Sequence, residues 1–202
     1  MSAQLLNTSN TVSEEDRKAV DQIAQSAVRM STLIGELQDF SRTRLGGMLT
    51  FKRGRADIAR LCENVVKEIR ASTQDCRIAF SQAGNTVADV NDERIEQMLS
   101  NLIANAVQHG ASSCDVDVAV TGGDWVVLIS VRNMGLPIPP EALDRIFEPL
   151  YRADASTPAK RTHLGLGLYI ARTIAIAHGG DIDVTSTEDA GTTFQVRLPR
   201  EP

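Results

Sequence analysis

The stretch Gly165-Leu166-Gly167-Leu168, with the helix-like run Tyr169 to Gly180 behind it, is the part of this chain that says most about its fold. Two glycines one residue apart let backbone N–H groups turn toward a ligand, because no Cβ stands in the way. His178 followed by Gly179 is a helix-stop signature. A helix start directly behind a glycine loop forms an anion site. The same residues also fit a glycine turn that merely admits a close-packed helix, so the rest of the chain has to decide.

Length and composition predict one folded domain plus an appendage. The 202 residues are 42% hydrophobic and 4% aromatic. The sequence has no apolar run near the roughly 20 residues that cross a bilayer, and no basic segment followed by an apolar core at its start. We therefore expect a cytoplasmic chain without direct membrane contact, from a parent that is either soluble or membrane-anchored. The net charge of −5 and the lack of a basic stripe argue against nucleic acid as a partner.

The cysteines carry no metal or disulfide signature. Cys62, Cys76 and Cys114 are odd in number and widely scattered, and no C-x-x-C pair occurs. We expect three buried, inert thiols in a reducing cytoplasm.

The N-terminal part predicts a long helix with a regular apolar seam. Ser13 stands before three acidic residues, which is a strong helix start, and the helix should run to about Arg44 and end at Gly46-Gly47. Such a helix is stabilised mainly by packing of its apolar face, so it should pack on a partner helix in its own chain or in a second copy. A core helix of the globular domain is the alternative, and the Gly-Gly break speaks against it. The seam consists of Val20, Ile23, Ala27, Met30, Ile34 and Leu37.

From Leu49 onward the pattern predicts an α+β fold, a two-layer sandwich with helices on one face of a set of strands. The polar run Ala153 to Arg161 predicts a mobile loop. Helices are expected over Ile58 to about Thr73, capped by Asp57, from the cap Asn91-Asp92 to near Gly110, and over Glu141 to Phe147. Strands are expected over Thr50–Arg53, Arg77–Phe80, Thr86–Val90, Ser113–Val120, Trp125–Arg132, Ile182–Ser186 and Thr193–Leu198, the second and third joined by a turn at Gly84-Asn85.

Asn101 and Asn105 are four residues apart on a predicted helix, so they share one face. Their neighbours are mostly apolar, where an asparagine needs a reason. An amide oxygen suits a hard cation such as Mg²⁺, which takes further ligands from phosphates. His109, at the end of this helix, either reaches a phosphate or is an ordinary C-terminal residue, and both readings stay open.

A second candidate segment is Asn133-Met134-Gly135, where a predicted strand ends before a Gly/Pro loop. A polar side chain and a glycine at a sheet rim offer a hydrogen-bonding group and close approach to a flat ring. Taken alone, an ordinary Gly/Pro turn is the simpler reading of this segment.

In their order, these segments resemble the ATP-binding catalytic domain of sensor histidine kinases, from the Bergerat-fold ATPase superfamily shared with gyrase and heat-shock chaperones. The resemblance covers Leu49 to Pro199. The matching segments are Asn101 to Ala106 (N box), Asn133 to Gly135 (first glycine box), Ile146 to Pro149 (F box), Gly165 to Leu168 (second glycine box) and Gly191 to Phe194 (final Gly-Thr turn).

The resemblance implies a site for ATP and Mg²⁺. Asn105 would hold Mg²⁺, Asn133 would bind the adenine amino group, and Gly135 would line the base. The backbone of the second glycine box, Gly165, Leu166, Gly167 and Leu168, would hold the phosphates. The other implied site residues are the catalytic Asn101 and Lys160, and the nucleotide-binding His109, Ile138, Phe147, Arg161 and Thr192, with Lys160 or Arg161 of an ATP lid over Ala153–His163 near the γ-phosphate.

Three positions depart from the family pattern. Asn133 stands where the family usually has Asp, and a neutral acceptor makes a weaker bond than a charged one. Pro137 replaces a usual glycine and removes an N–H, and Gln108 replaces a common Lys. We expect ATP to bind, with reduced strength.

The resemblance also extends to the predicted N-terminal helix. Met30 to Arg42 resembles the second helix of the family's dimerisation and phosphoacceptor hairpin. We expect residues 1–48 to be a remnant of that hairpin, with its second helix over about 13–44, and residues 49–202 to be the catalytic domain. His109, His163 and His178 lack the phosphoacceptor motif around them, so the chain should begin downstream of its own acceptor, as a truncated or natural fragment.

The resemblance implies an ATP-dependent protein-histidine kinase. It would transfer the γ-phosphoryl of Mg-ATP to a His outside this chain, for onward transfer to a response regulator receiver domain, and it would form a homodimer through the Val20–Leu37 seam. One alternative is a non-catalytic phosphotransfer scaffold or pseudokinase of the same fold, which Asn133 and Pro137 favour. Another is a serine kinase acting on an anti-sigma partner, which the heptad helix speaks against.

Overall fold

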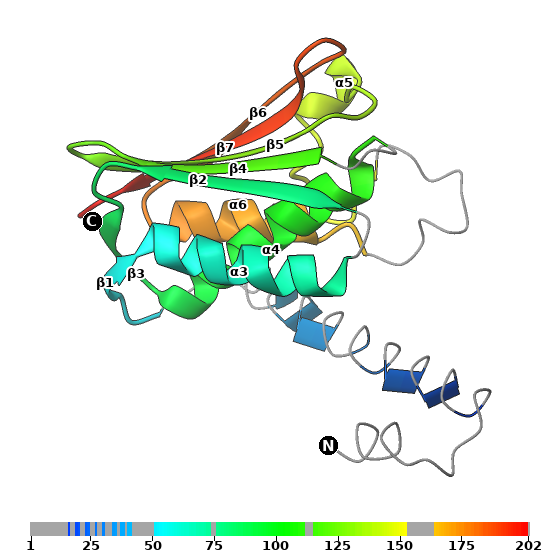
Figure 1. Ribbon diagram of the computed structural model, residues 1–202, viewed down its shortest axis with the longest axis horizontal. Helices are drawn as coiled ribbons and strands as arrows, with labels where there is room; N and C mark the ends of the chain where they lie inside the picture. Colours follow the sequence, from blue (N-terminus) through cyan, green and yellow to red (C-terminus); the bar gives the residue numbers. More distant parts are fainter. Residues whose placement is uncertain are drawn as a thin grey trace.

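The computed structural model describes residues 51–73, 76–111, 115–152 and 164–201, and scattered positions between 16 and 41. Helices cover one face of a five-stranded sheet, which makes the α+β two-layer sandwich that the pattern predicts (Figure 1). The elements are β1 (Gly54–Asp57), α3 (Ile58–Ser72), β2 (Arg77–Ala83), β3 (Val87–Val90), α4 (Asp92–His109), β4 (Asp115–Gly122), β5 (Val126–Asn133), α5 (Pro140–Leu143), α6 (Gly167–Ala177), β6 (Asp181–Thr187) and β7 (Gly191–Pro199).

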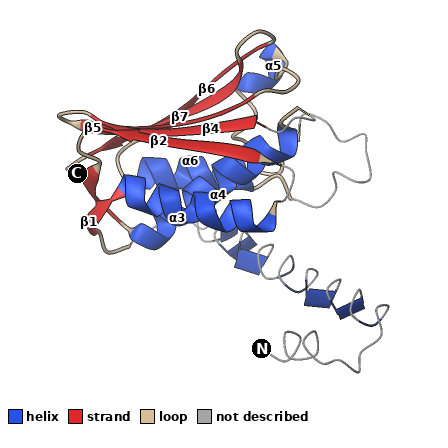
Figure 2. Ribbon diagram, viewed as in Figure 1, coloured by secondary structure: helices blue, strands red, loops and turns tan. Residues whose placement is uncertain are grey.

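The large sheet has the strand order β2-β4-β5-β7-β6 and a separate pair is formed by β1 and β3. All neighbours in the large sheet run antiparallel except β2 and β4, which pair in parallel. Helices α3, α4 and α6 lie together on one face, and α5 lies beyond one end of the sheet (Figure 2).

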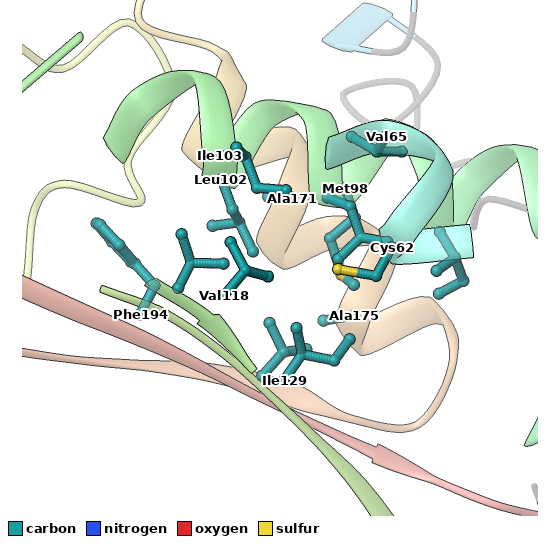
Figure 3. Close-up of a cluster of buried hydrophobic side chains, with 14 of the residues drawn as sticks. Cys62, Val65, Met98, Leu102, Ile103, Val118, Ile129, Ala171, Ala175 and Phe194 are labelled. Atoms are coloured by element: carbon teal, nitrogen blue, oxygen red, sulfur yellow. The ribbon is translucent and has the colours of Figure 1, made fainter. Parts of the chain in front are cut away.

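The core fills the space between the helices and the sheet. Alternate residues of β4, β5 and β7 are buried, because successive side chains of a strand point to opposite faces. Val118, Ile129 and Phe194 of the sheet face Leu102 and Ala171 of the helices (Figure 3). This packing fixes the positions of α4 and α6, the two helices that carry the predicted site.

Both predicted helix caps are confirmed. The side chain of Asp57 accepts a hydrogen bond from the Ala59 N–H at 3.1 Å. The side chain of Asn91 accepts one from the Arg94 N–H at 3.0 Å, directly before α4. Each cap satisfies one of the N–H groups that a helix start leaves without an intrahelical partner.

Two expected elements differ from the structure. Residues 51–53 are irregular, and the strand expected at Thr50–Arg53 lies instead at 54–57 as β1. Strands β2 and β3 are joined through Gly84-Asn85 as expected, and each pairs with another strand, β3 with β1 and β2 with β4. The short helix expected over Glu141–Phe147 is α5, which begins at Pro140 and ends at Leu143. Proline suits this first position, because the N–H that it lacks would have no intrahelical partner there.

The expectation of three free thiols is wrong for Cys76, which forms a disulfide. Parallel pairing of Arg77 with Asp115 brings the starts of β2 and β4 together, a proximity that sequence spacing does not reveal. Cys114 lies outside the described residues. Cys62 is a free, buried thiol, and burial raises its pKa to about 12, so it is inert as expected.

Every described position between 16 and 41 is helical, while both ends of the helix expected over Ser13–Arg44 lie outside the described residues. The phenyl ring of Phe40 contacts the ring of Tyr169 of α6 edge-on, with 5.9 Å between their centroids. In the described part of the chain, no helix is long and apolar enough to span a membrane.

Candidate functional site

The N-terminus of α6 follows the glycine loop directly, as predicted. Leu166 is the N-cap residue and makes no side-chain cap hydrogen bond, and no acidic residue lies in the first turn. The first N–H groups of the helix therefore lack a side-chain acceptor. Together with the positive end of the helix dipole they suit an anion such as a phosphate group.

Gly165 shapes this loop. Its φ of +73° lies in the left-handed region, and a Cβ there would lie 2.8 Å from the carbonyl oxygen of Tyr151. Its own carbonyl accepts a hydrogen bond from the Leu150 N–H at 3.0 Å, so the loop is tied to the segment behind the F box. Leu166 is fully buried in the core beneath the loop, while Gly167 and Leu168 are partly exposed.

Asn101 joins α4 to this loop. Its Nδ2 donates to the Gly167 carbonyl oxygen at 3.2 Å. This hydrogen bond holds the start of α6 against α4, so Asn101 acts as a positioning residue within the predicted site.

Asn105 lies one turn further along α4 and is partly exposed, and its amide makes no hydrogen bond to any described residue. No three Asp, Glu, His or Cys side chains cluster as a metal site within the described ranges. The amide oxygen of Asn105 fits Mg²⁺, which keeps several waters and takes other ligands from phosphates. His109 ends α4 and is exposed.

Asn133 ends β5 on the buried face of the sheet. Its residue is 3% exposed, and its backbone pairs with Val116 on one side and Thr192 on the other. Its side-chain amide makes no hydrogen bond to any residue that the structure describes. Buried amides are normally satisfied, and an unsatisfied group costs about 1–3 kcal/mol. Such a group indicates that a ligand or water completes the site.

Two glycines surround Asn133 closely. A Cβ at Gly135 would collide with the carbonyl oxygen of His109, so only glycine lets this loop meet the end of α4. A Cβ at Gly191 would collide with the Asn133 carbonyl oxygen, and the Gly191 φ is +73°. The structure thus brings the first glycine box, the end of α4 and the final Gly-Thr turn together.

Three other predicted site residues, Thr192, Ile138 and Phe147, make contacts within the protein. The hydroxyls of Thr192 and Ser186 are 2.7 Å apart, and the Ile138 N–H donates to Ser186 Oγ at 2.9 Å. Thr192 therefore anchors the loop that carries Ile138. Phe147 stacks edge-on against Phe194, with 6.3 Å between ring centroids, and so packs against the core.

Lys160, Arg161 and the rest of the expected lid over Ala153–His163 lie outside the described residues. Pro137 and Gln108, two of the departures from the family pattern, are exposed.

A cluster at the opposite ends of α4 and α6 escaped the sequence reasoning. His178 is 2% exposed, its Nε2 accepts from the Asn91 N–H at 3.1 Å, and its Nδ1 donates to the Ile174 carbonyl at 2.8 Å. Its ring stacks on Phe51 with 4.4 Å between centroids, and Arg53 donates to the Ala177 carbonyl at 2.7 Å. The visible signal was a histidine ahead of Gly-Gly, but its partner lies 87 residues away.

A sequence profile of the histidine kinase-, DNA gyrase B- and HSP90-like ATPases matches residues 90–202, more than half of the chain. The chain belongs to this ATPase family. Within the family it is the ATP-binding catalytic domain of a sensor histidine kinase. The matched range contains every box that the sequence reasoning identified, from Asn101 to Phe194, and it confirms the resemblance.

The chain spans only part of the length of its relatives. It is 34% identical over 199 residues to a bacteriophytochrome of Pseudomonas aeruginosa, a match that covers 98% of this chain but 27% of that protein. The catalytic domain of histidine kinase ThkA superposes with a TM-score of 0.65 at 26% identity, over 75% of this chain and 98% of that one. Full-length ShkA in complex with AMPPNP superposes with a TM-score of 0.76 at 26% identity, over 98% of this chain and 41% of that one.

Proposed function

We propose that this domain binds Mg-ATP and transfers the γ-phosphoryl group to a histidine on a separate polypeptide segment, for onward transfer to a response regulator receiver domain. The single observation that carries the nucleotide site is the buried amide of Asn133, which has no hydrogen-bond partner among the described residues. A purine edge would complete it. The similar ShkA structure is a complex with the ATP analogue AMPPNP, which supports the same reading.

The ligand contacts follow from the geometry of the two ends of the site. The N-terminus of α6 and the bare backbone of Gly165 and Gly167 would bind the phosphates, and Asn101 would hold that loop in place. Asn133 would bind the base beside Gly135. Lys160 or Arg161 of the lid would approach the γ-phosphate.

Magnesium fits the Asn105 side chain, whose amide oxygen is a hard ligand without a described competitor. When bound, the ion neutralises charge on the phosphates, which is a main source of catalysis in phosphoryl transfer. Asn105 would orient it, and the rest of the site positions the nucleotide for attack by the acceptor histidine.

We also propose that residues 1–48 continue a dimerisation hairpin, with a long helix over about 13–44, and that residues 49–202 form the catalytic domain. In the described positions of this helix, Ile23, Met30, Ile34 and Leu37 are between 55% and 68% exposed. Such a row of apolar side chains supports a second copy of the chain as the partner that covers it.

Calorimetric titration of ADP with and without Mg²⁺ tests the nucleotide site. Asn105→Ala should weaken Mg-ADP binding more than ADP binding alone. Ser100→Ala is the matched control, since Ser100 is exposed on the same helix and lies outside the proposed site. A folded sample that gives no heat at millimolar nucleotide would refute the proposal.

Labelling with γ-labelled ATP tests the transfer step. The chain alone should show no acid-labile phosphohistidine, because none of its three histidines has the acceptor motif. Adding an acceptor segment in trans should produce labelling on that segment. Nucleotide binding without any such transfer would favour the alternative, a non-catalytic scaffold of the same fold, to which the Asn133 and Pro137 departures point.

A further inference from the structure

The side-chain amide of Asn133 has more hydrogen-bonding capacity than a single use requires. It carries two N–H donors on Nδ2 and two acceptor lone pairs on Oδ1. The residue is 3% exposed, and the sheet ladder already pairs its backbone with Val116 and Thr192. Donor and acceptor are therefore both available at one buried point.

The polar groups next to Asn133 are engaged elsewhere. The Thr192 hydroxyl bonds to Ser186, and Ser186 also accepts from the Ile138 N–H. The Met134 sulfur accepts from Arg132 at 3.5 Å. None of these described groups bonds to the Asn133 amide and fixes which of its two ends faces outward.

Gly135 packs closely between the same amide and the end of α4. A Cβ at this glycine would lie 3.3 Å from Nδ2 of Asn133 and would collide with the His109 carbonyl oxygen. Glycine therefore keeps the Nδ2 side of the amide free of a neighbouring side chain. Because oxygen and nitrogen of an asparagine amide are nearly equal in size, a half-turn of the amide exchanges donor and acceptor without changing its shape.

We infer that Asn133 makes the base site permissive, so that the domain binds purine nucleotides with a six-oxo group as well as those with a six-amino group. The inference rests on the proposed nucleotide site. With adenine, Oδ1 accepts from the six-amino group. With hypoxanthine, the amide turns over and Nδ2 donates to the six-oxo group.

A carboxylate at this position would behave differently. Ionised Asp accepts hydrogen bonds but donates none. It would bind the six-amino group strongly and repel a six-oxo oxygen. A buried polar group facing the wrong base edge is left unpaired, which is the situation in which sites discriminate most strongly.

The test compares ADP with inosine diphosphate on the native chain and on Asn133→Asp, by calorimetry with Mg²⁺. Inosine diphosphate differs from ADP at the six-position and N1, and it lacks the two-amino group of guanine. We expect the two Kd values to agree within about tenfold on the native chain and to differ by about a hundredfold or more on Asn133→Asp. Asn105→Ala should weaken both nucleotides alike, because it acts at the metal.

Each outcome separates the inference from the proposed function. If ADP binds the native chain and inosine diphosphate binds a hundredfold more weakly, the permissive site is refuted and the nucleotide site stands. If neither nucleotide binds, the proposed function fails with it. The native ratio decides even if Asn133→Asp does not fold.

Discussion

At the residue scale, the site depends on one buried amide, that of Asn133, and on two glycines beside it. Asn133 is buried without a described side-chain partner, while Gly135 and Gly191 let two backbone segments close around it. A buried polar group that is left unsatisfied lowers stability, so a ligand or a water should complete its hydrogen bonds. Substitutions here should therefore affect both ligand binding and stability.

Asn133→Asp should tighten ADP binding by several-fold to tenfold. The carboxylate would accept a charge-assisted hydrogen bond from the six-amino group, worth ~1 kcal/mol more than a neutral one. Calorimetry measures this directly. Unchanged or weaker affinity would mean that Asn133 does not face the base, or that its surroundings are tuned for a neutral amide.

Gly135→Ala should abolish nucleotide binding and lower the free energy of unfolding by about 1–3 kcal/mol, because the new methyl group would collide with the His109 carbonyl. Gly54→Ala is the matched control, since a Cβ there meets nothing within 4 Å. Calorimetry measures the binding and urea denaturation the stability. Equal stability of the two variants would show that the loop moves freely away from α4.

At the element scale, hydrogen bonds connect α4 and α6 at two points along their length. Asn101 holds the start of α6 near the phosphate loop, and Asn91 at the start of α4 donates to His178 at the end of α6. The irregular segment 51–53 packs against the same two residues. The Phe51 ring stacks on His178, and the Lys52 carbonyl accepts a hydrogen bond from Asn91 Nδ2 at 2.9 Å. The helices of the site are thus anchored to the segment that precedes β1.

The His178 contact predicts a loss of stability in mild acid. Nε2 must be unprotonated to accept from Asn91, and burial, opposed in part by the hydrogen bond to Ile174, lowers the pKa of His178 below its ordinary 6.5. Nearby Arg53 lowers it further and Asp89 opposes this. The unfolded chain therefore binds more protons below about pH 6.5, so the stabilisation is complete above that pH and is lost as the pH falls through the lower folded value.

Urea denaturation of the native chain and of His178→Gln between about pH 7.5 and 5.5 checks this. His178→Gln should be less stable at neutral pH, because the ring stacking on Phe51 is lost. Its stability should change less over this pH range. A full native slope in His178→Gln would assign the pH dependence to other groups.

At the scale of the whole molecule, the exposed seam predicts self-association at micromolar concentration. Burying a large apolar side chain contributes ~1.5–3 kcal/mol, so covering Ile23, Met30, Ile34 and Leu37 would contribute several kcal/mol. Ile23→Glu combined with Ile34→Glu should dissociate the assembly and leave ADP affinity unchanged. Sedimentation velocity reports the assembly.

Gln25→Glu combined with Thr32→Glu is the control, because heptad spacing puts both positions opposite the seam and the added charge is equal. A strict monomer in the native chain, with rapid amide exchange over residues 20–37, would mean that the helix frays when no partner covers it.

The fold class, the two helix caps and the order of the boxes can all be read from the sequence. These depend on local properties: Asp57 and Asn91 cap their own helices, and Gly165 needs no distant partner to adopt a positive φ. The site residues were grouped by resemblance, and their roles remain predictions until nucleotide binding is measured.

Which strands pair and which polar groups meet became clear from the folded chain alone. Strand β2 pairs with β4 and not with β3, which follows it in the sequence, and Cys76 forms a disulfide. His178 accepts a hydrogen bond from the N–H of Asn91, 87 residues away. Folding also leaves the amide of Asn133 buried without a described partner. Periodicity and capping report each segment's own preferences, whereas long-range pairing depends on how the whole core packs, which no single segment encodes.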